Sequence, residues 1–142
     1  MGVSLPVVLL IGVGRFGRAH LEEWLRLATE QRVRIAGLVV ASDASRQILG
    51  AETGLPVHSS FQPSLLYGVD AVDIVTPTST HFDLVAACLP HAHVFVEKPV
   101  CEDSAQAEAL FELARRHARV LMVGHIYHHH PLTALLRQVL TA

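Results

Sequence analysis

The sequence is poor in the residues that build metal centres, disulfide frameworks and nucleic-acid surfaces. Its two cysteines, Cys88 and Cys101, form no CxxC pair, which excludes the common zinc motifs and predicts reduced thiols. Charges of both signs are scattered around a formal net charge of −2, so no basic stripe is available for nucleic acid or anionic lipid. Asparagine is absent, and Lys98 is the only lysine among eleven lysine and arginine residues. The position of that single lysine is therefore informative.

Long apolar segments are absent as well. The N-terminal run LPVVLLIGVG is too short to cross a bilayer, and no cationic segment precedes it as in a secretion signal. We therefore expect no membrane partner and a cytoplasmic location. With 142 residues, 51% of them apolar, the chain has the size of a single domain, 1–142, that can bury a core.

Apolar runs alternate along the chain with amphipathic stretches of helical period. Continuous apolar strands separated by helices are typical of a parallel sheet that is covered on both faces. The pattern therefore predicts an α/β protein with a doubly wound parallel sheet of about six strands. The predicted strands are 7–11, 32–40, 57–59, 71–76, 93–97 and 120–124, and the predicted helices are 15–28, 44–52, 80–89, 104–117 and 131–140. Gly54 is expected to close the second helix, and Asp103 or Ser104 to cap the fourth.

A GxGxxG motif follows the first predicted strand and opens the first predicted helix. In that context the first glycine permits a tight turn, the second lets a pyrophosphate approach the backbone, and the third lets helix and strand pack closely. The motif predicts dinucleotide binding, and a purely structural turn is the alternative. The residues assigned to the cofactor here are Gly12, Gly14, Arg15, Phe16 and Gly17.

The end of the second strand bears on the choice of cofactor. An acidic residue normally holds the adenosine ribose there, but this strand ends at Val40, and the nearest acid, Asp43, comes three residues later. Ser42 and Arg46, with Arg15, are suited to a 2′-phosphate, because a guanidinium matches phosphate geometry. NADP is therefore favoured over NAD, unless Asp43 reaches back to the ribose.

Three segments resemble successive motifs of the glucose-fructose oxidoreductase, inositol dehydrogenase and MocA (Gfo/Idh/MocA) family. They are GVGRFGRAH, DAVDIVTPTSTHFDLVAACLPHAHVFVEKPV and VGHIYHHHP, and together they cover essentially the whole chain. The resemblance implies an N-terminal Rossmann domain that binds NAD(P), in an oxidoreductase acting on a sugar, cyclitol or related polyol. It also implies that Thr76 and Pro77 line the nicotinamide, that His81 belongs to the same site, and that Glu97 and Lys98 lie beside cofactor and substrate.

Lysine at position 98 suits the implied chemistry. Oxidation of an alcohol by hydride transfer requires removal of the hydroxyl proton, and arginine does not lose its own proton in proteins, whereas lysine can. Lys98 is therefore the first catalytic candidate. The alternative is a surface lysine paired with Glu97.

The histidine-rich segment HIYHHH is the last candidate site. Three consecutive histidines cannot all face one ion in regular structure, and no cysteine or carboxylate lies nearby, so no metal is expected. The resemblance places His125 beside the substrate pocket, as a second catalytic candidate. Cys101, without an adjacent histidine, is expected to be a buried inert thiol.

The resemblance implies a further α+β domain after the Rossmann domain, and we expect none within these 142 residues. Two interpretations follow. The chain is an oxidoreductase or the cofactor-binding half of one, or it is a non-catalytic dinucleotide-binding module or sensor. The sequence leaves open the substrate, the direction of reaction, activity of the chain alone, and whether it is a short protein or a fragment. Oligomeric state is also open, a homo-oligomer included.

Overall fold

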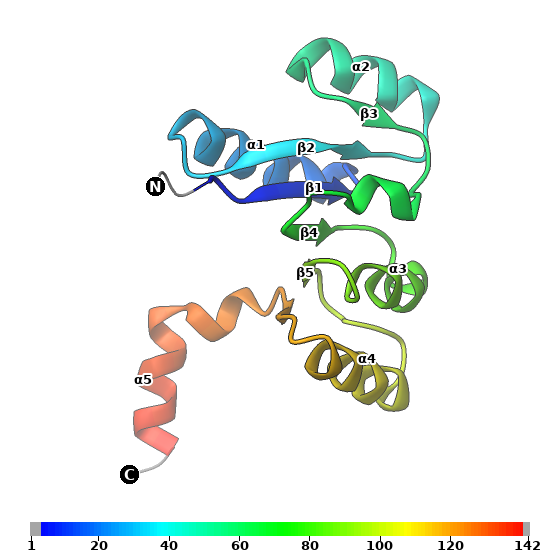
Figure 1. Ribbon diagram of the computed structural model, residues 1–142. Helices are drawn as coiled ribbons and strands as arrows, with labels where there is room; N and C mark the ends of the chain where they lie inside the picture. The colour runs from blue at the N-terminus through cyan, green and yellow to red at the C-terminus, as the bar shows by residue number, and fades with distance from the viewer. Residues whose placement is uncertain (1–3, 141–142) are drawn as a thin grey trace.

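The computed structural model describes residues 4–140 and contains one parallel sheet of six strands. The strand order is β3-β2-β1-β4-β5-β6, so the chain starts in the middle of the sheet and builds outward in both directions (Figure 1). This arrangement confirms the predicted doubly wound α/β fold. The strands are β1 (Val7–Ile11), β2 (Arg34–Val39), β3 (Val57–His58), β4 (Ala71–Ile74), β5 (His93–Val96) and β6 (Leu121–Val123).

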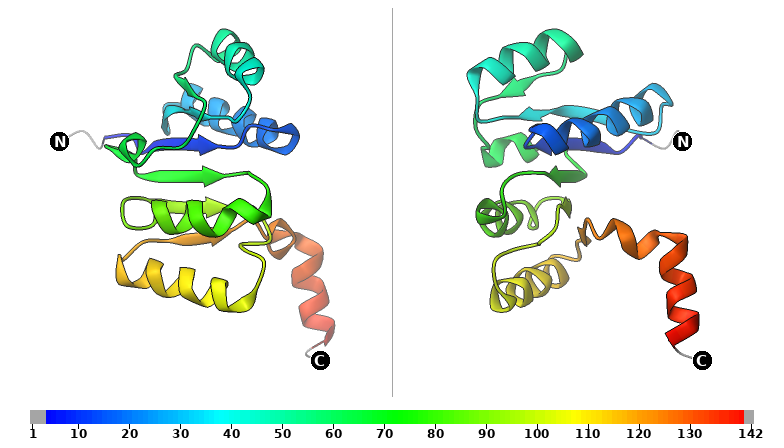
Figure 2. Two further views of the ribbon diagram at one scale, coloured as in Figure 1. Left: turned by 90° about the vertical axis from the view of Figure 1, so that its right-hand side faces the viewer. Right: turned by 180° about the vertical axis from the view of Figure 1, so that it is seen from behind.

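Helices cover the sheet in two layers. Residues of α1 and α2 pack with one face of the sheet, and residues of α3 and α4 pack with the opposite face. The last helix, α5, extends away from the sheet, as both views in Figure 2 show. The helices are α1 (Arg15–Thr29), α2 (Asp43–Thr53), α3 (His81–Cys88), α4 (Ser104–Arg116) and α5 (Pro131–Leu140), with short 3₁₀ turns η1 (Pro63–Leu66), η2 (Thr78–Thr80) and η3 (Ile126–His129).

The central strand β1 is continuously apolar because both of its faces are buried. Successive side chains point to opposite faces, so Leu9 and Ile11 pack with the α3 and α4 layer, whereas Val8 and Leu10 pack with the α1 and α2 layer. All four are at most 3% exposed. Burial of each such side chain contributes roughly 1.5–3 kcal/mol, so both faces of β1 hold the two helical layers on the sheet.

The predicted helix ends are also found. Gly54 adopts the left-handed conformation, with φ of 67°, and closes α2. Asp103, rather than Ser104, is the N-cap of α4, and its carboxylate accepts the main-chain N–H of Gln106 at 2.8 Å. Such a cap stabilises a helix by about 1 kcal/mol.

The main differences from the predicted elements lie in the connections. The second strand begins at Arg34 rather than at residue 32, because the N–H of Arg32 is bonded to the carbonyl of Leu27 in the turn that ends α1. The three 3₁₀ turns carry no helical repeat and were not predicted. Within residues 4–140, no helix is both long enough and apolar enough to cross a membrane.

Candidate cofactor and substrate site

The glycine turn after β1 is tightly packed at its first and third glycines. Gly12 has φ of 92°, and a Cβ there would lie 2.4 Å from the carbonyl oxygen of Val75. A Cβ on Gly17 would lie 2.1 Å from the carbonyl oxygen of Gly12, where helix α1 meets the turn. The protein's own backbone therefore requires both glycines.

Gly14, the second glycine, has a different environment. A Cβ at this position would meet no atom within 4 Å, so the fold itself does not exclude a side chain there. Gly14 is the N-cap of α1, no side chain caps this end, and the first turn holds no acidic residue. The N–H groups of this turn, at the positive end of the helix dipole, suit an anion such as a pyrophosphate.

A groove of about 740 Å³ begins at this turn. Because all strands are parallel, the groove lies where the carboxyl ends of β1, β2 and β4 meet the following turns, the usual ligand site of such sheets. The first two glycines of the GxGxxG motif, the tip of β2 and the predicted nicotinamide segment thus share one space. The groove is lined chiefly by residues 11–14, 39–42, 59–61, 75–77 and 79–80, with Ser45, Asp83 and Leu84.

The tip of β2 presents no carboxylate to this groove. Val40 and Ala41 both line the groove, Val40 as a buried residue of the α1 and α2 layer and Ala41 as an exposed residue. Ser42 lines it too, while its hydroxyl accepts the N–H of Ser45 at 3.3 Å. Asp43 pairs with Arg46, with 3.0 Å between carboxylate and guanidinium.

Arg46 lies beside the groove rather than in it. It lines a neighbouring cleft of about 380 Å³, and the two spaces share Ser59 and Ser60. Arg15 and Phe16 are exposed on the first turn of α1 and do not line the groove. Of the residues assigned to the cofactor from the sequence, Gly12, Gly14, Ser42, Thr76 and Pro77 line the groove itself.

His81 lies behind the groove and joins two turns. It is 1% exposed, its Nε2 lies 2.8 Å from the carbonyl oxygen of Thr76, and its Nδ1 lies 2.8 Å from that of Pro99. His81 therefore holds the turn after β4 against the turn after β5.

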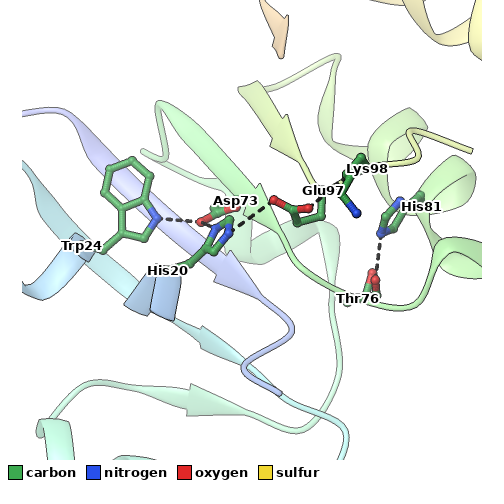
Figure 3. Close-up of polar contacts among 7 residues, drawn as sticks. All are labelled: His20, Trp24, Asp73, Thr76, His81, Glu97 and Lys98. Carbon is green, nitrogen blue, oxygen red and sulfur yellow. Dashed lines mark hydrogen bonds and ion pairs between the residues drawn. The ribbon is translucent and has the colours of Figure 1, made fainter. Parts of the chain in front are cut away.

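Lys98 stands at the end of β5 with an exposed side chain. Figure 3 shows its amino group on the side of Thr76 and His81. Among the described residues, no hydrogen bond or ion pair involves the ammonium group, and the alternative pairing with Glu97 is not found. Lys98 lines a cavity of about 300 Å³ together with Gly124, His125 and residues of η3. The two catalytic candidates, Lys98 and His125, thus face one space.

A buried polar cluster lies on the other side of the strand ends, and sequence reasoning did not identify it. The Oδ2 atom of Asp73, in the middle of β4, accepts the indole N–H of Trp24 at 2.7 Å and lies 2.9 Å from Nδ1 of His20. The Nε2 atom of His20 lies 3.5 Å from Oε1 of Glu97 (Figure 3). An acid inside the apolar strand AVDIV, and the i, i+4 spacing of His20 and Trp24, were the available signals.

The cluster favours a protonated histidine. The hydrogen bond to Asp73 raises the pKa of His20 above its ordinary value of 6.5; burial acts in the opposite direction, and the charges of Asp73 and Glu97 add to the increase. Asp73 is fully buried and Glu97 is 8% exposed. The contacts of His20 with both carboxylates therefore favour its positively charged form.

The histidine-rich segment does not gather into a cluster. In η3, the rings of His128 and His129 meet edge to face, with 5.9 Å between their centroids. In the part of the chain that the structure describes, no group of three or more His, Cys, Asp and Glu residues could hold a metal ion.

Comparison with known proteins agrees with this geometry. Residues 7–125 match a family described as an oxidoreductase family with an NAD-binding Rossmann fold. UDP-N-acetylglucosamine 3-dehydrogenase of Acidithiobacillus ferrooxidans is 38% identical over 133 residues, which are 91% of this chain and 40% of that protein. The scyllo-inositol 2-dehydrogenase (NAD(+)) of Bacillus subtilis is 28% identical over 118 residues, covering 81% of this chain and 34% of that enzyme.

Solved structures show the same likeness. The structure of the A. ferrooxidans dehydrogenase matches with a TM-score of 0.80 and 34% identity over 94% of this chain and 42% of that one. A 3-ketoreductase from Actinomadura kijaniata, in complex with TDP-benzene and NADP, matches with a TM-score of 0.78 and 25% identity over 96% and 42%. The chain therefore spans less than half the length of these relatives.

Proposed function

Because this chain belongs to the Gfo/Idh/MocA family of oxidoreductases with an NAD-binding Rossmann fold, we propose that it is the cofactor-binding part of a hydride-transferring enzyme. Its substrate would be a sugar, a nucleotide sugar or a cyclitol, the classes named for its relatives. The observation that carries the proposal is the groove that begins at the uncapped first turn of α1 and passes Thr76 and Pro77.

Each part of the site has a role in this proposal. The first turn of α1 at Gly14 binds the pyrophosphate, and the turn at Thr76 and Pro77 orients the nicotinamide, which supplies the hydride chemistry when bound. Lys98 takes the hydroxyl proton of an alcohol or returns it to a ketone. His125, at the same cavity, contacts the substrate.

We further propose a preference for NADP. A carboxylate at the tip of β2 would repel a 2′-phosphate, and the groove has none at Val40 or Ala41. Ser42 and Ser45 offer hydroxyl donors in the groove, and the Arg46 guanidinium lies in the adjoining cleft. Relatives occur with either cofactor: the A. kijaniata structure contains NADP, whereas the B. subtilis enzyme is named for NAD(+), so the preference rests on the groove residues alone.

Cofactor choice is tested by titrating the protein with NADH and NADPH and following nicotinamide fluorescence. Both Val40 and Ala41 line the groove, but Val40 also belongs to the buried core, so the exposed Ala41 is the position that accepts a charge without disturbing the fold. Ala41→Asp should weaken NADPH at least about tenfold, close to 1.4 kcal/mol, and spare NADH. Ala41→Asn, which matches it in size without the charge, should keep the original order. Tighter NADH than NADPH in the unchanged protein would reject the preference, and binding of neither would reject the function.

The role of Lys98 is tested in the enzyme that contains this chain, with UDP-N-acetylglucosamine and scyllo-inositol as probe substrates. Lys98→Met should lower kcat roughly 10²–10⁴-fold, the range for loss of a general acid or base, while NADPH still binds. Lys98→Arg keeps the charge but cannot exchange the proton, so it should not restore the rate. Normal turnover in Lys98→Met would remove Lys98 from the mechanism.

A further inference from the structure

We propose that His20 is a positioning residue of this site: its protonated ring bridges the carboxylates of Asp73 and Glu97, and through Glu97 it sets the main-chain position of Lys98. The catalytic role of Lys98 rests on the proposed function. The physical coupling between His20 and Lys98 does not depend on it.

The first step is the charge balance of the cluster. Asp73 is fully buried, Glu97 is 8% exposed, and among residues 4–140 no lysine or arginine forms an ion pair with either. If His20 were neutral, two buried carboxylates would have no positively charged partner, which is costly in a poorly solvated site. A protonated His20 supplies the counter-charge and lowers that cost, while Oδ1 of Asp73 and Oε1 of Glu97 have no hydrogen-bond partner within residues 4–140.

The second step is the seating of the ring. His20 stacks on Phe95 of β5, with 5.7 Å between ring centroids and 17° between planes, and Phe16 of its own helix meets it edge to face at 5.3 Å. The titratable groups that face the ring are Asp73 from β4 and Glu97 after β5. Aromatic contacts on the ring and a carboxylate at each nitrogen define one orientation for the imidazole.

The third step leads from Glu97 to Lys98. The Oε2 atom of Glu97 accepts the main-chain N–H of Lys98 at 3.2 Å. The Oε1 atom, on the His20 side, lies against Gly124, where a Cβ would be only 2.5 Å away. The carboxylate is therefore held between His20, the Lys98 backbone and Gly124, and the last two both line the cavity of the catalytic candidates.

The direction of the pH effect follows from the same contacts. The hydrogen bond to Asp73 raises the pKa of His20 above 6.5, so the bridge extends to higher pH than an ordinary histidine would allow and is lost as the pH rises through that raised pKa. Above that point Glu97 loses its charged partner, and the N–H of Lys98 loses a fixed acceptor.

The chain offers a direct probe, because it contains a single lysine. Protein labelled with ¹⁵N-lysine gives one amide signal, which is the N–H of Lys98 itself. Between about pH 6 and pH 9 the chemical shift of this signal should change in one step. The midpoint pH of that step should equal the midpoint at which the His20 ring signals titrate. In His20→Gln the step should disappear, and the amide proton should move upfield because its acceptor is no longer held. His117→Gln, an exposed histidine at the end of α4, is the matched control and should keep the step.

The outcomes are distinct. A Lys98 amide in the unchanged protein that does not follow His20, or a step that persists in His20→Gln, overturns the proposal; the first outcome needs no variant to fold. The measurement needs neither cofactor nor substrate. If NADPH fails to bind while the step is present, the proposed function fails and the coupling stands. If NADPH binds and the step is absent, only the role of His20 fails.

In the active enzyme, His20→Gln should lower kcat and leave KM for NADPH within about twofold, because Lys98 and not the cofactor groove is displaced. The pH dependence of kcat in His20→Gln should no longer contain a step at the pKa of His20. A loss confined to KM for NADPH would contradict a route through Lys98.

Discussion

Glu97 and Lys98 are adjacent in the chain, yet their side chains serve two different environments. The Glu97 carboxylate lies toward His20, whereas the Lys98 amino group lies toward Thr76 and His81 (Figure 3). The contact that does join them is the main-chain N–H of Lys98, which donates to the carboxylate. The pair therefore separates a buried charged cluster from an exposed amine that is available to a ligand.

Gly14 and Gly17 should respond differently when each is replaced by alanine. We expect Gly14→Ala to leave thermal stability nearly unchanged, because no atom lies within 4 Å of the new Cβ, and to weaken NADPH at least about tenfold. Thermal unfolding and a fluorescence titration measure the two effects.

Gly17→Ala is the structural counterpart of that variant. Its Cβ would meet the backbone oxygen of Gly12 at 2.1 Å, so we expect a loss of about 2–4 kcal/mol in the free energy of unfolding. Equal stability losses in both variants would show that Gly14, too, serves only the fold.

Replacement of His81 should loosen the turns beneath the groove. His81→Ala removes the partner of two main-chain carbonyl groups and leaves a cavity, so we expect the free energy of unfolding in urea to fall by about 2–4 kcal/mol. His91→Ala, at an exposed position, should change it by less than about 0.5 kcal/mol. An unchanged His81→Ala protein would contradict the bridging role.

Stability should depend on pH through His20. Because the folded protein raises the pKa of His20 above 6.5, its contribution is fully present below that value and is lost as the pH rises through the folded-state pKa. The free energy of unfolding should therefore fall more steeply with rising pH in the unchanged protein than in His20→Gln. Emission of Trp24, the only tryptophan, can follow unfolding in urea. Parallel pH curves for the two proteins would refute the assignment.

The Cys88 thiol should be inert in the folded protein. Burial raises the pKa of Cys88 to about 12, so almost no thiolate exists at neutral pH. In a Cys101→Ser variant, a chromogenic disulfide reagent should give no rapid reaction until urea unfolds the chain. Serine can keep the hydrogen bond that Cys101 donates to the Asp103 carbonyl, which makes the variant a conservative background. Rapid labelling under native conditions would contradict the burial of Cys88.

Several features of the protein were determined by the sequence itself. The apolar runs and helical repeats predicted the doubly wound sheet, because strands buried on both faces and amphipathic helices have different periods. The turn at Gly12 to Gly17 was predictable from local backbone chemistry, and so was the helix end at Gly54. The resemblance of three motifs to one oxidoreductase family, now shown by the comparison, depended on order and spacing along the chain.

The relations between side chains from different elements were decided only by the tertiary structure. Asp73 looked like an isolated acid within a strand, and His20 like one residue of an amphipathic helix, until packing of α1 on β4 and β5 placed His20 between Asp73 and Glu97. The bridge formed by His81, and the exposure of Ala41 beside the buried Val40, have the same origin. Local sequence determines which backbone forms, but charge pairing and burial depend on distances between segments far apart in the chain, and these exist only after the layers have packed.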